Sequence, residues 1–179
     1  MSSLVKNIIR FVLFILVQAF VLDKVPQLHQ YVKPWLYFLF VLWLPFNLSR
    51  ISIMIIAFMF GLCMDYFSGW PGLHAAPCVL IAYVRPFLLN VLLPQEKTEF
   101  SYAEPSIKSL GFAPYSVYVL ILTFLHHAYL VLLEALSLQS GEFLYFIGKV
   151  TAATAISMLL IYLSELLFQR KARYRTNAA

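Results

Sequence analysis

The sequence predicts an all-α membrane protein, with six transmembrane helices in a compact bundle that forms a single integral membrane domain over residues 1–179. The chain is 62% hydrophobic and 12% charged, whereas soluble domains are roughly half apolar and a quarter charged. Its mean hydropathy is +0.82. Six stretches of the chain approach the roughly 20 apolar residues that a helix needs to cross a hydrocarbon core about 30 Å thick. The length leaves little room for an additional soluble domain.

The six predicted spans cover residues 8–22, 35–48, 51–67, 73–93, 114–138 and 143–168. A polar turn at 23–26 ends the first span. Pro34 precedes the second, in a position that suits the start of a helix. Only residues 47–50 separate the second span from the third, which predicts a tight antiparallel pair of helices.

The fourth and sixth predicted spans contain residues that affect helix geometry. Pro77 and Pro86 interrupt helical hydrogen bonding in the fourth. The sixth carries small residues at Gly148, Ala152 and Ala155, a pattern that lets another helix approach closely in lipid. That second helix belongs either to the same bundle or to a partner protein, and the sequence leaves both alternatives open.

The distribution of basic residues predicts that both termini are cytoplasmic. The inner side then holds Lys6, Arg10, Arg50, Lys97, Lys108, Arg170, Lys171, Arg173 and Arg175, and the outer side Lys24, Lys33 and Lys149. This excess follows the positive-inside rule, so the basic residues indicate topology and not a nucleic-acid partner. The long loop 94–113 is cytoplasmic in this arrangement. We expect a solvated connector there, with a docking segment as the alternative.

Six ionisable side chains inside or at the edges of the spans are candidate functional residues, because charges at membrane depth are costly. They are Asp65, His74, Arg85, His126, His127 and Glu134. Asp65 and His74 fall near the outer surface. Arg85 lies deeper and keeps its charge, so it needs a carboxylate or a backbone carbonyl as partner. The sequence does not assign that partner.

The adjacent pair His126 and His127 suggests a proton relay or a metal site. Neighbouring residues of a helix point about 100° apart, so the two rings do not easily bind one ion. We therefore expect neutral histidines that hydrogen-bond between helices.

Catalytic motifs are missing from the sequence, which contains no GxSxG, HExxH, Walker or GxGxxG pattern. Cys63, Asp65, His74 and Cys78 are zinc-ligand types, but their spacing matches no compact zinc site. We therefore predict a protein that is not an enzyme and has neither a metal nor a cofactor.

The stretch 57–86, AFMFGLCMDYFSGWPGLHAAPCVLIAYVRP, resembles MreD, the rod shape-determining membrane protein family of bacteria. Residues 36–46, LYFLFVLWLPF, are similar to the second span of that family. The chain length, the six-span layout and the basic tail fit the same family. The specific part of the resemblance lies at Gly61, Asp65, Gly72, His74, Arg85 and Pro86.

The resemblance implies particular positions for these residues. Gly61 would allow close helix packing, and Asp65 would fix the outer end of the third span. Gly72 and His74 would shape the outer turn. Arg85 would lie in the interior, beside a bend at the proline that follows it.

The resemblance also implies a function and a fold. The chain would be a non-catalytic scaffold in the bacterial inner membrane that organises peptidoglycan synthesis during cell elongation. Its partners would be MreC and, directly or indirectly, MreB, RodA and a transpeptidase penicillin-binding protein. The fold would be similar to that of the substrate-binding subunits of energy-coupling-factor transporters.

Two alternative functions follow from the same sequence. The transporter kinship suggests a vitamin-binding subunit, although the first span lacks the small-residue pattern of such subunits and offers only Ala19. The buried ionisable residues suggest a small ion or proton pathway protein.

Overall fold

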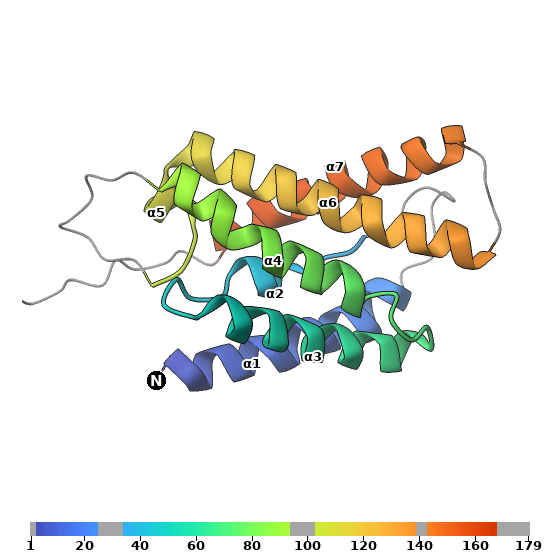
Figure 1. The fold of residues 1–179 in the computed structure, drawn as a ribbon, viewed down its shortest axis with the longest axis horizontal. Helices are drawn as coiled ribbons and strands as arrows, with labels where there is room; N and C mark the ends of the chain where they lie inside the picture. Colours follow the sequence, from blue (N-terminus) through green and yellow to red (C-terminus); the bar gives the residue numbers. More distant parts are fainter. Residues whose placement is uncertain (1–2, 25–33, 94–102, 139–142, 168–179) are drawn as a thin grey trace, which may run out of the picture.

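The computed structural model describes residues 3–24, 34–93, 103–138 and 143–167, and these form helices, turns and irregular segments without a strand (Figure 1). The helices are α1 (Ser3–Leu16), α2 (Leu39–Leu42), α3 (Arg50–Ser68), α4 (Ala75–Leu92), α5 (Ile107–Leu110), α6 (Phe112–Leu138) and α7 (Phe143–Leu167). A π-helical turn (Val17–Val21) and a 3₁₀ turn (Leu22–Lys24) extend α1. The predicted all-α class is confirmed over this part of the chain.

Five of the described helices are long and apolar enough to cross a membrane. They are Val5–Lys24, Arg50–Ser68, Ala75–Leu92, Phe112–Ser137 and Phe143–Leu167. Between 17% and 44% of the most apolar window in each is buried inside the bundle. Most of the remaining surface therefore faces outward, as expected of helices surrounded by lipid.

The second predicted span, 35–48, is not a continuous helix, and this corrects the sequence prediction. Only the four-residue α2 is α-helical in it, between turns and bends. Almost every residue from Trp35 to Leu44 is buried. An apolar run of about 10–14 residues is more often a buried segment than a membrane span, because burial in protein selects the same residues as burial in lipid.

Residues 34–49, hereafter the crossing segment, return the chain from one end of the bundle to the other. Rings pair midway along α1 and α3 (Phe11 with Phe60, centroids 5.1 Å apart), and again between the α1 extension and the end of α3 (Phe20 with Phe67, 5.8 Å). The two helices therefore run in the same direction. The segment that connects the end of α1 to the start of α3 must then run back between the two ends.

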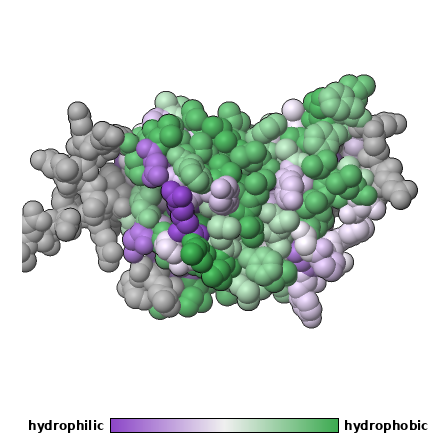
Figure 2. All heavy atoms as spheres, viewed as in Figure 1, coloured by the Kyte–Doolittle hydropathy of each residue, from purple (hydrophilic) through white to green (hydrophobic). Residues whose placement is uncertain are grey.

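The long helices α3, α4, α6 and α7 pack side by side in the order in which they follow along the chain. Helix α4 packs between α3 and α6, and α7 packs on α6; α1 and α3 lie side by side along one edge (Figure 1). Apolar residues cover the middle of the face shown in Figure 2, and hydrophilic residues gather toward one end. Tyr66 and Trp70 are 83% and 49% exposed near the α3–α4 turn, where aromatic side chains suit a membrane interface.

The small-residue strip of α7 lies beside the packed face of that helix and not within it. Ala155 is exposed and Ala152 is only half-buried, as is Gly148. The residues that pack inward are Ala153 and Ser157, both with no exposed surface. The strip is therefore available to a second helix at the surface of the bundle.

Helices α3 and α4 form a closely packed hairpin around Gly61. The turn between them uses Gly69 and Gly72, at φ +73° and +86°, a conformation that favours glycine. Pro77 lies in the first turn of α4, where no helical hydrogen bond is lost, and Pro86 lies inside the helix.

We predict that Gly61→Ala destabilises the protein by about 1–3 kcal/mol, the usual cost of an overpacked site. A Cβ at position 61 would contact the Cα of Ala75 and lie 2.8 Å from its backbone nitrogen. Both contacts are with backbone, so the two helices would have to separate. Thermal unfolding in detergent measures the effect, with Leu62→Ala on the outward face as the control. An equal melting temperature for Gly61→Ala and wild type would contradict the close approach.

Candidate functional site

The candidate site is a network of buried polar side chains that surrounds the crossing segment. Backbone groups that lack helical partners need other hydrogen bonds wherever water is excluded. At the start of the segment, Gln18 of the α1 extension provides them. Its Oε1 accepts from the N–H groups of Leu36 (2.9 Å) and Tyr37 (3.3 Å), and its Nε2 donates to the carbonyl of Pro34 (3.1 Å). Gln18 is 1% exposed.

Arg85 and Tyr118 bind the other end of the crossing segment. The Tyr118 hydroxyl donates to the carbonyl of Leu42 (2.9 Å) and accepts from Arg85 Nε (3.1 Å). Arg85 Nη2 donates to the carbonyl of Leu44. The partner of Arg85 that the sequence left open is therefore a backbone carbonyl with a tyrosine hydroxyl. Within the described residues, no carboxylate forms an ion pair with this guanidinium, which is 1% exposed.

His126 and His127 lie in the middle of a chain of four hydrogen bonds. The Tyr37 hydroxyl lies 2.8 Å from His126 Nε2, and the Nδ1 atoms of the two histidines lie 3.1 Å apart. His127 Nε2 lies 2.9 Å from the Ser157 Oγ, which donates to the carbonyl of Trp35 (2.7 Å). The chain thus joins the crossing segment, α6 and α7.

The last bond of this chain fixes the direction of the others. The Ser157 hydroxyl has one proton, which it donates to a carbonyl, so it accepts from His127 Nε2. His127 Nδ1 then accepts from His126 Nδ1, and His126 Nε2 accepts from Tyr37. Every bond is made with both imidazoles neutral and in opposite tautomers. A peptide carbonyl has no proton to pass on, so the geometry suits a structural chain better than a relay.

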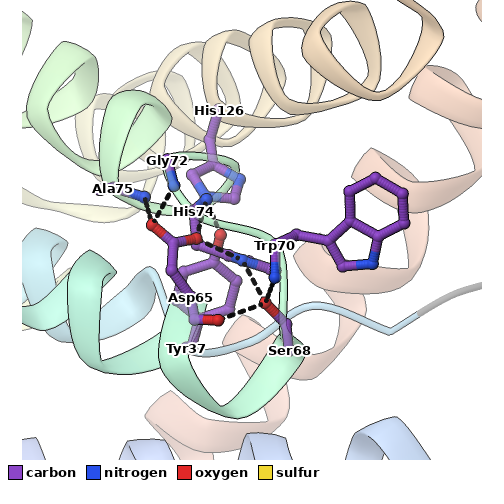
Figure 3. Close-up of polar contacts among 8 residues, drawn as sticks. All are labelled: Tyr37, Asp65, Ser68, Trp70, Gly72, His74, Ala75 and His126. Carbon is purple, nitrogen blue, oxygen red and sulfur yellow. Dashed lines mark hydrogen bonds and ion pairs between the residues drawn. The ribbon is translucent and has the colours of Figure 1, made fainter. Parts of the chain in front are cut away.

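Asp65 holds the α3–α4 turn together through hydrogen bonds with three residues (Figure 3). Its Oδ2 accepts from the N–H groups of Gly72 (2.8 Å) and Ala75 (3.2 Å). Its Oδ1 accepts from the His74 backbone N–H (2.6 Å) and lies 2.9 Å from His74 Nδ1. Asp65 and His74 are both 4% exposed. The carboxylate therefore satisfies free N–H groups at the start of α4.

The Asp65 turn and the histidine chain meet at Tyr37. Its ring packs edge-on against His74 (centroids 5.3 Å apart) and His126 (5.2 Å), and Figure 3 shows the three side chains close together. The first of these contacts is aromatic packing, and the second carries a hydrogen bond. The α3–α4 turn is therefore supported directly by the crossing segment.

A pocket of about 300 Å³ opens beside this turn. Its wall includes the aromatic rings of Trp35 and Trp70 and the charged residues Asp23, Lys24 and Glu134. Glu134 forms an ion pair with Lys149 of α7 (2.7 Å). The pocket thus combines aromatic surface with charges of both signs, which is the lining expected for a small polar or zwitterionic molecule.

A second polar cluster closes the opposite end of the bundle. Arg10 pairs with Glu104 (2.7 Å), and the Tyr115 hydroxyl donates to Glu165 (2.8 Å). Glu104 is 8% exposed, and Ser109 of α5 is also buried. The described part of the predicted loop 94–113 is therefore packed onto the bundle and is not a solvated connector. Residues 94–102 lie outside the described structure.

The described residues contain no group of three histidine, cysteine or acidic side chains placed to hold a metal ion. Cys63 is half-buried and Cys78 is buried, and both are free thiols. Asp65 and His74 instead bind each other and the backbone.

The structure brings together some of the residues singled out in the sequence and separates others. Asp65 pairs with His74, and His126 with His127. Arg85 binds the far end of the crossing segment, and Glu134 forms a separate ion pair. The sequence analysis missed four uncharged members of the network, because it searched for ionisable groups. They are Gln18, Tyr37, Tyr118 and Ser157.

Gln18 was recognisable in principle. It is the only uncharged residue with a strongly polar side chain in the predicted span 8–22, and buried amides require hydrogen-bond partners.

No protein-family model matches the chain, and the curated proteins and solved structures likewise give no match.

We predict that Asp65→Asn lowers the free energy of unfolding by about 2 kcal/mol, since hydrogen bonds to a charged group contribute roughly 1.5–3 kcal/mol. An amide NH₂ in place of Oδ2 would face the N–H groups of Gly72 and Ala75. Thermal unfolding and amide hydrogen exchange of the turn measure the change. Asp23→Asn, at a carboxylate that accepts from Gln18, is the control. Unchanged exchange at Gly72 and Ala75 would exclude this role for the carboxylate.

Proposed function

We propose that the chain is a non-catalytic scaffold of the MreD type in the bacterial inner membrane, acting with MreC to organise peptidoglycan synthesis during cell elongation. MreB, RodA and a transpeptidase penicillin-binding protein are its further direct or indirect partners. The bundle crosses the membrane six times, five times as a helix and once as the crossing segment, and its fold is similar to that of energy-coupling-factor substrate-binding subunits.

The observation that carries this proposal is the role of the residues on which the MreD resemblance rests. Gly61, Asp65, Gly72 and His74 meet in one hairpin, where they set the α3–α4 approach and the turn. Arg85 binds the crossing segment, which is the region similar to the second span of the family. The matching positions therefore lie in the α3–α4 hairpin and at the contact between α4 and the crossing segment, as expected if the chain shares the architecture of that family.

The use of the buried polar groups favours a scaffold over an enzyme. In the described residues, the side chains of Gln18, Asp65, Arg85 and Tyr118 bind backbone groups of neighbouring elements. Side chains that bind backbone groups of neighbouring elements hold the helices in place. A catalytic site would instead aim such side chains at a cavity.

The positions of the basic residues support cytoplasmic termini. Lys6 and Arg10 lie at one end of the bundle, where both contact Glu104. Arg50 begins α3, which runs parallel to α1, and so lies at the same end. Lys24 ends the α1 extension at the opposite end. The positive-inside rule places the end with more basic residues in the cytoplasm.

The pocket of about 300 Å³ favours a second candidate function, a substrate-binding subunit of a vitamin transporter. A scaffold that binds no ligand can also contain a pocket of this size. A small molecule that remains bound through purification would favour transport, and MreC that remains bound would favour the scaffold. For the proton pathway, the hydrogen-bond chain offers less support because it ends at the Trp35 carbonyl.

We predict that depletion of this protein in its own bacterium converts rods into rounded cells, and that a tagged wild-type copy restores rods and co-purifies MreC. Without a scaffold that positions cell-wall synthesis, we expect growth to lose its restriction to the long axis of the cell. Microscopy and mass spectrometry of the purified complex are the measurements. A tagged, unrelated multi-pass protein is the control for non-specific recovery. Unaltered rods after depletion, or recovery of MreC equal to that control, would reject the proposal.

A further inference from the structure

An apolar crevice of about 540 Å³ lies between α1, the crossing segment and α3. Ile8 and Phe11 line it on α1, Phe40 and Leu44 on the crossing segment, and Ile55 and Met59 on α3. Ile8, Ile55 and Met59 are 55%, 57% and 52% exposed. The crevice therefore opens on the outer surface of two helices that are apolar enough to span a membrane.

The crevice exists because the crossing segment is not a full helix. Its residues Phe40 and Leu44 are 3% and 2% exposed and lie in the core, so they form the floor of the gap between α1 and α3. A regular helix in this position would present outward side chains that fill such a gap. The withdrawn segment leaves a hollow that a non-protein group must fill when the surroundings are lipid.

The dimensions of the crevice fit one hydrocarbon chain. A volume of about 540 Å³ is many times the roughly 10–15 Å³ that one water molecule needs on this measure, so the crevice has room for a run of methylene groups. The lining residues on α3, Ile55 to Met59, and those on α1, Asn7 to Phe11, each cover a rise of roughly 6 Å at 1.5 Å per residue. The crevice therefore holds part of one acyl chain within a single leaflet, which is about half of a 30 Å core. A partner helix about 10 Å in diameter needs far more space along this length.

The polar groups of the crevice lie at a single end. Asn7 and Asn47 line it there. Lys6 precedes Asn7 in the chain, and its side chain is 50% exposed with its Nζ 3.5 Å from Glu104. The amino-terminal ends of the parallel helices α1 and α3 point to this end, so their dipoles add positive potential. In the described residues at this end, the bases Lys6, Arg10, Arg50 and Lys108 outnumber the acids Glu104 and Glu165. The charge favours an anionic headgroup.

We propose that the crevice binds one anionic phospholipid, with an acyl chain between α1 and α3 and the phosphate beside Asn7, Asn47 and Lys6. The acyl chain completes the packing that the crossing segment leaves open. The headgroup charge selects the lipid, since each basic residue near anionic lipid adds to its affinity. The site lies in the leaflet that faces the start of α1.

Native mass spectrometry of the full chain in detergent tests this site, with phosphatidylglycerol and phosphatidylcholine of identical acyl chains as probes. We expect one phosphatidylglycerol per protein and weaker retention of phosphatidylcholine. Ile55→Trp fills the mouth of the crevice and should weaken phosphatidylglycerol binding about tenfold or more. Met59→Trp is a second variant of the same kind. Leu159→Trp, at a 66% exposed residue of α7, is the matched control and should bind as wild type does.

The headgroup contact is tested separately with Lys6→Gln. Loss of one basic residue should weaken phosphatidylglycerol binding about fivefold, and Lys24→Gln at the opposite end should leave it unchanged. Equal retention of the two lipids by wild type would overturn the anionic assignment. Failure of wild type to retain lipid, equal binding by Ile55→Trp and Leu159→Trp, or a photo-crosslinker at position 55 that captures a protein in native membranes would overturn the site.

Discussion

The structure depends on one constraint: where water is absent, every backbone N–H and C=O group needs a partner within the protein. The crossing segment contains only one helical turn; its N–H groups from Leu39 to Leu44 donate to carbonyls of the segment itself, and the groups outside these bonds need partners from other elements. Bonds from other elements are supplied by Gln18 of the α1 extension, Tyr118 of α6, Arg85 of α4 and Ser157 of α7. The crossing segment is thus hydrogen-bonded to four other elements of the bundle. Their arrangement follows from the need to pair its backbone groups.

The same constraint explains why a buried arginine is tolerated without a carboxylate partner in the described structure. A lysine in its place could not reach two acceptors in a fixed planar geometry, whereas the guanidinium of Arg85 donates to both Leu44 and Tyr118. The Asp65 turn applies the complementary solution, with a carboxylate that accepts from free N–H groups. Arg85, inside α4, donates to a carbonyl of the crossing segment, and Asp65 accepts from N–H groups at the start of α4.

The sequence predicted the long helices well, because each combines an apolar run of span length with polar or glycine-rich ends. The third predicted span differs from α3 by one residue at each end. The second predicted span was wrong as a continuous helix, because hydropathy does not distinguish a helix in lipid from a buried segment in a protein interior. That Asp65 and His74 lie at the same end of the bundle followed from their places at the ends of consecutive spans. The bond between Ser157 and Trp35 joins residues 122 positions apart, and no local pattern encodes such a contact.

Cysteine labelling from one side of the membrane tests the central claim, that residues 34–49 cross between α1 and α3. Single cysteines replace Lys24 and Asn47, both exposed, in a chain with Cys63→Ala and Cys78→Ala. A membrane-impermeant maleimide is applied to sealed vesicles of known orientation, and to permeabilised vesicles as the labelling control. If the segment crosses, the reagent labels only one of the two cysteines in sealed vesicles and both after permeabilisation. Labelling of both from the same side would show that the segment turns back, and would contradict the account.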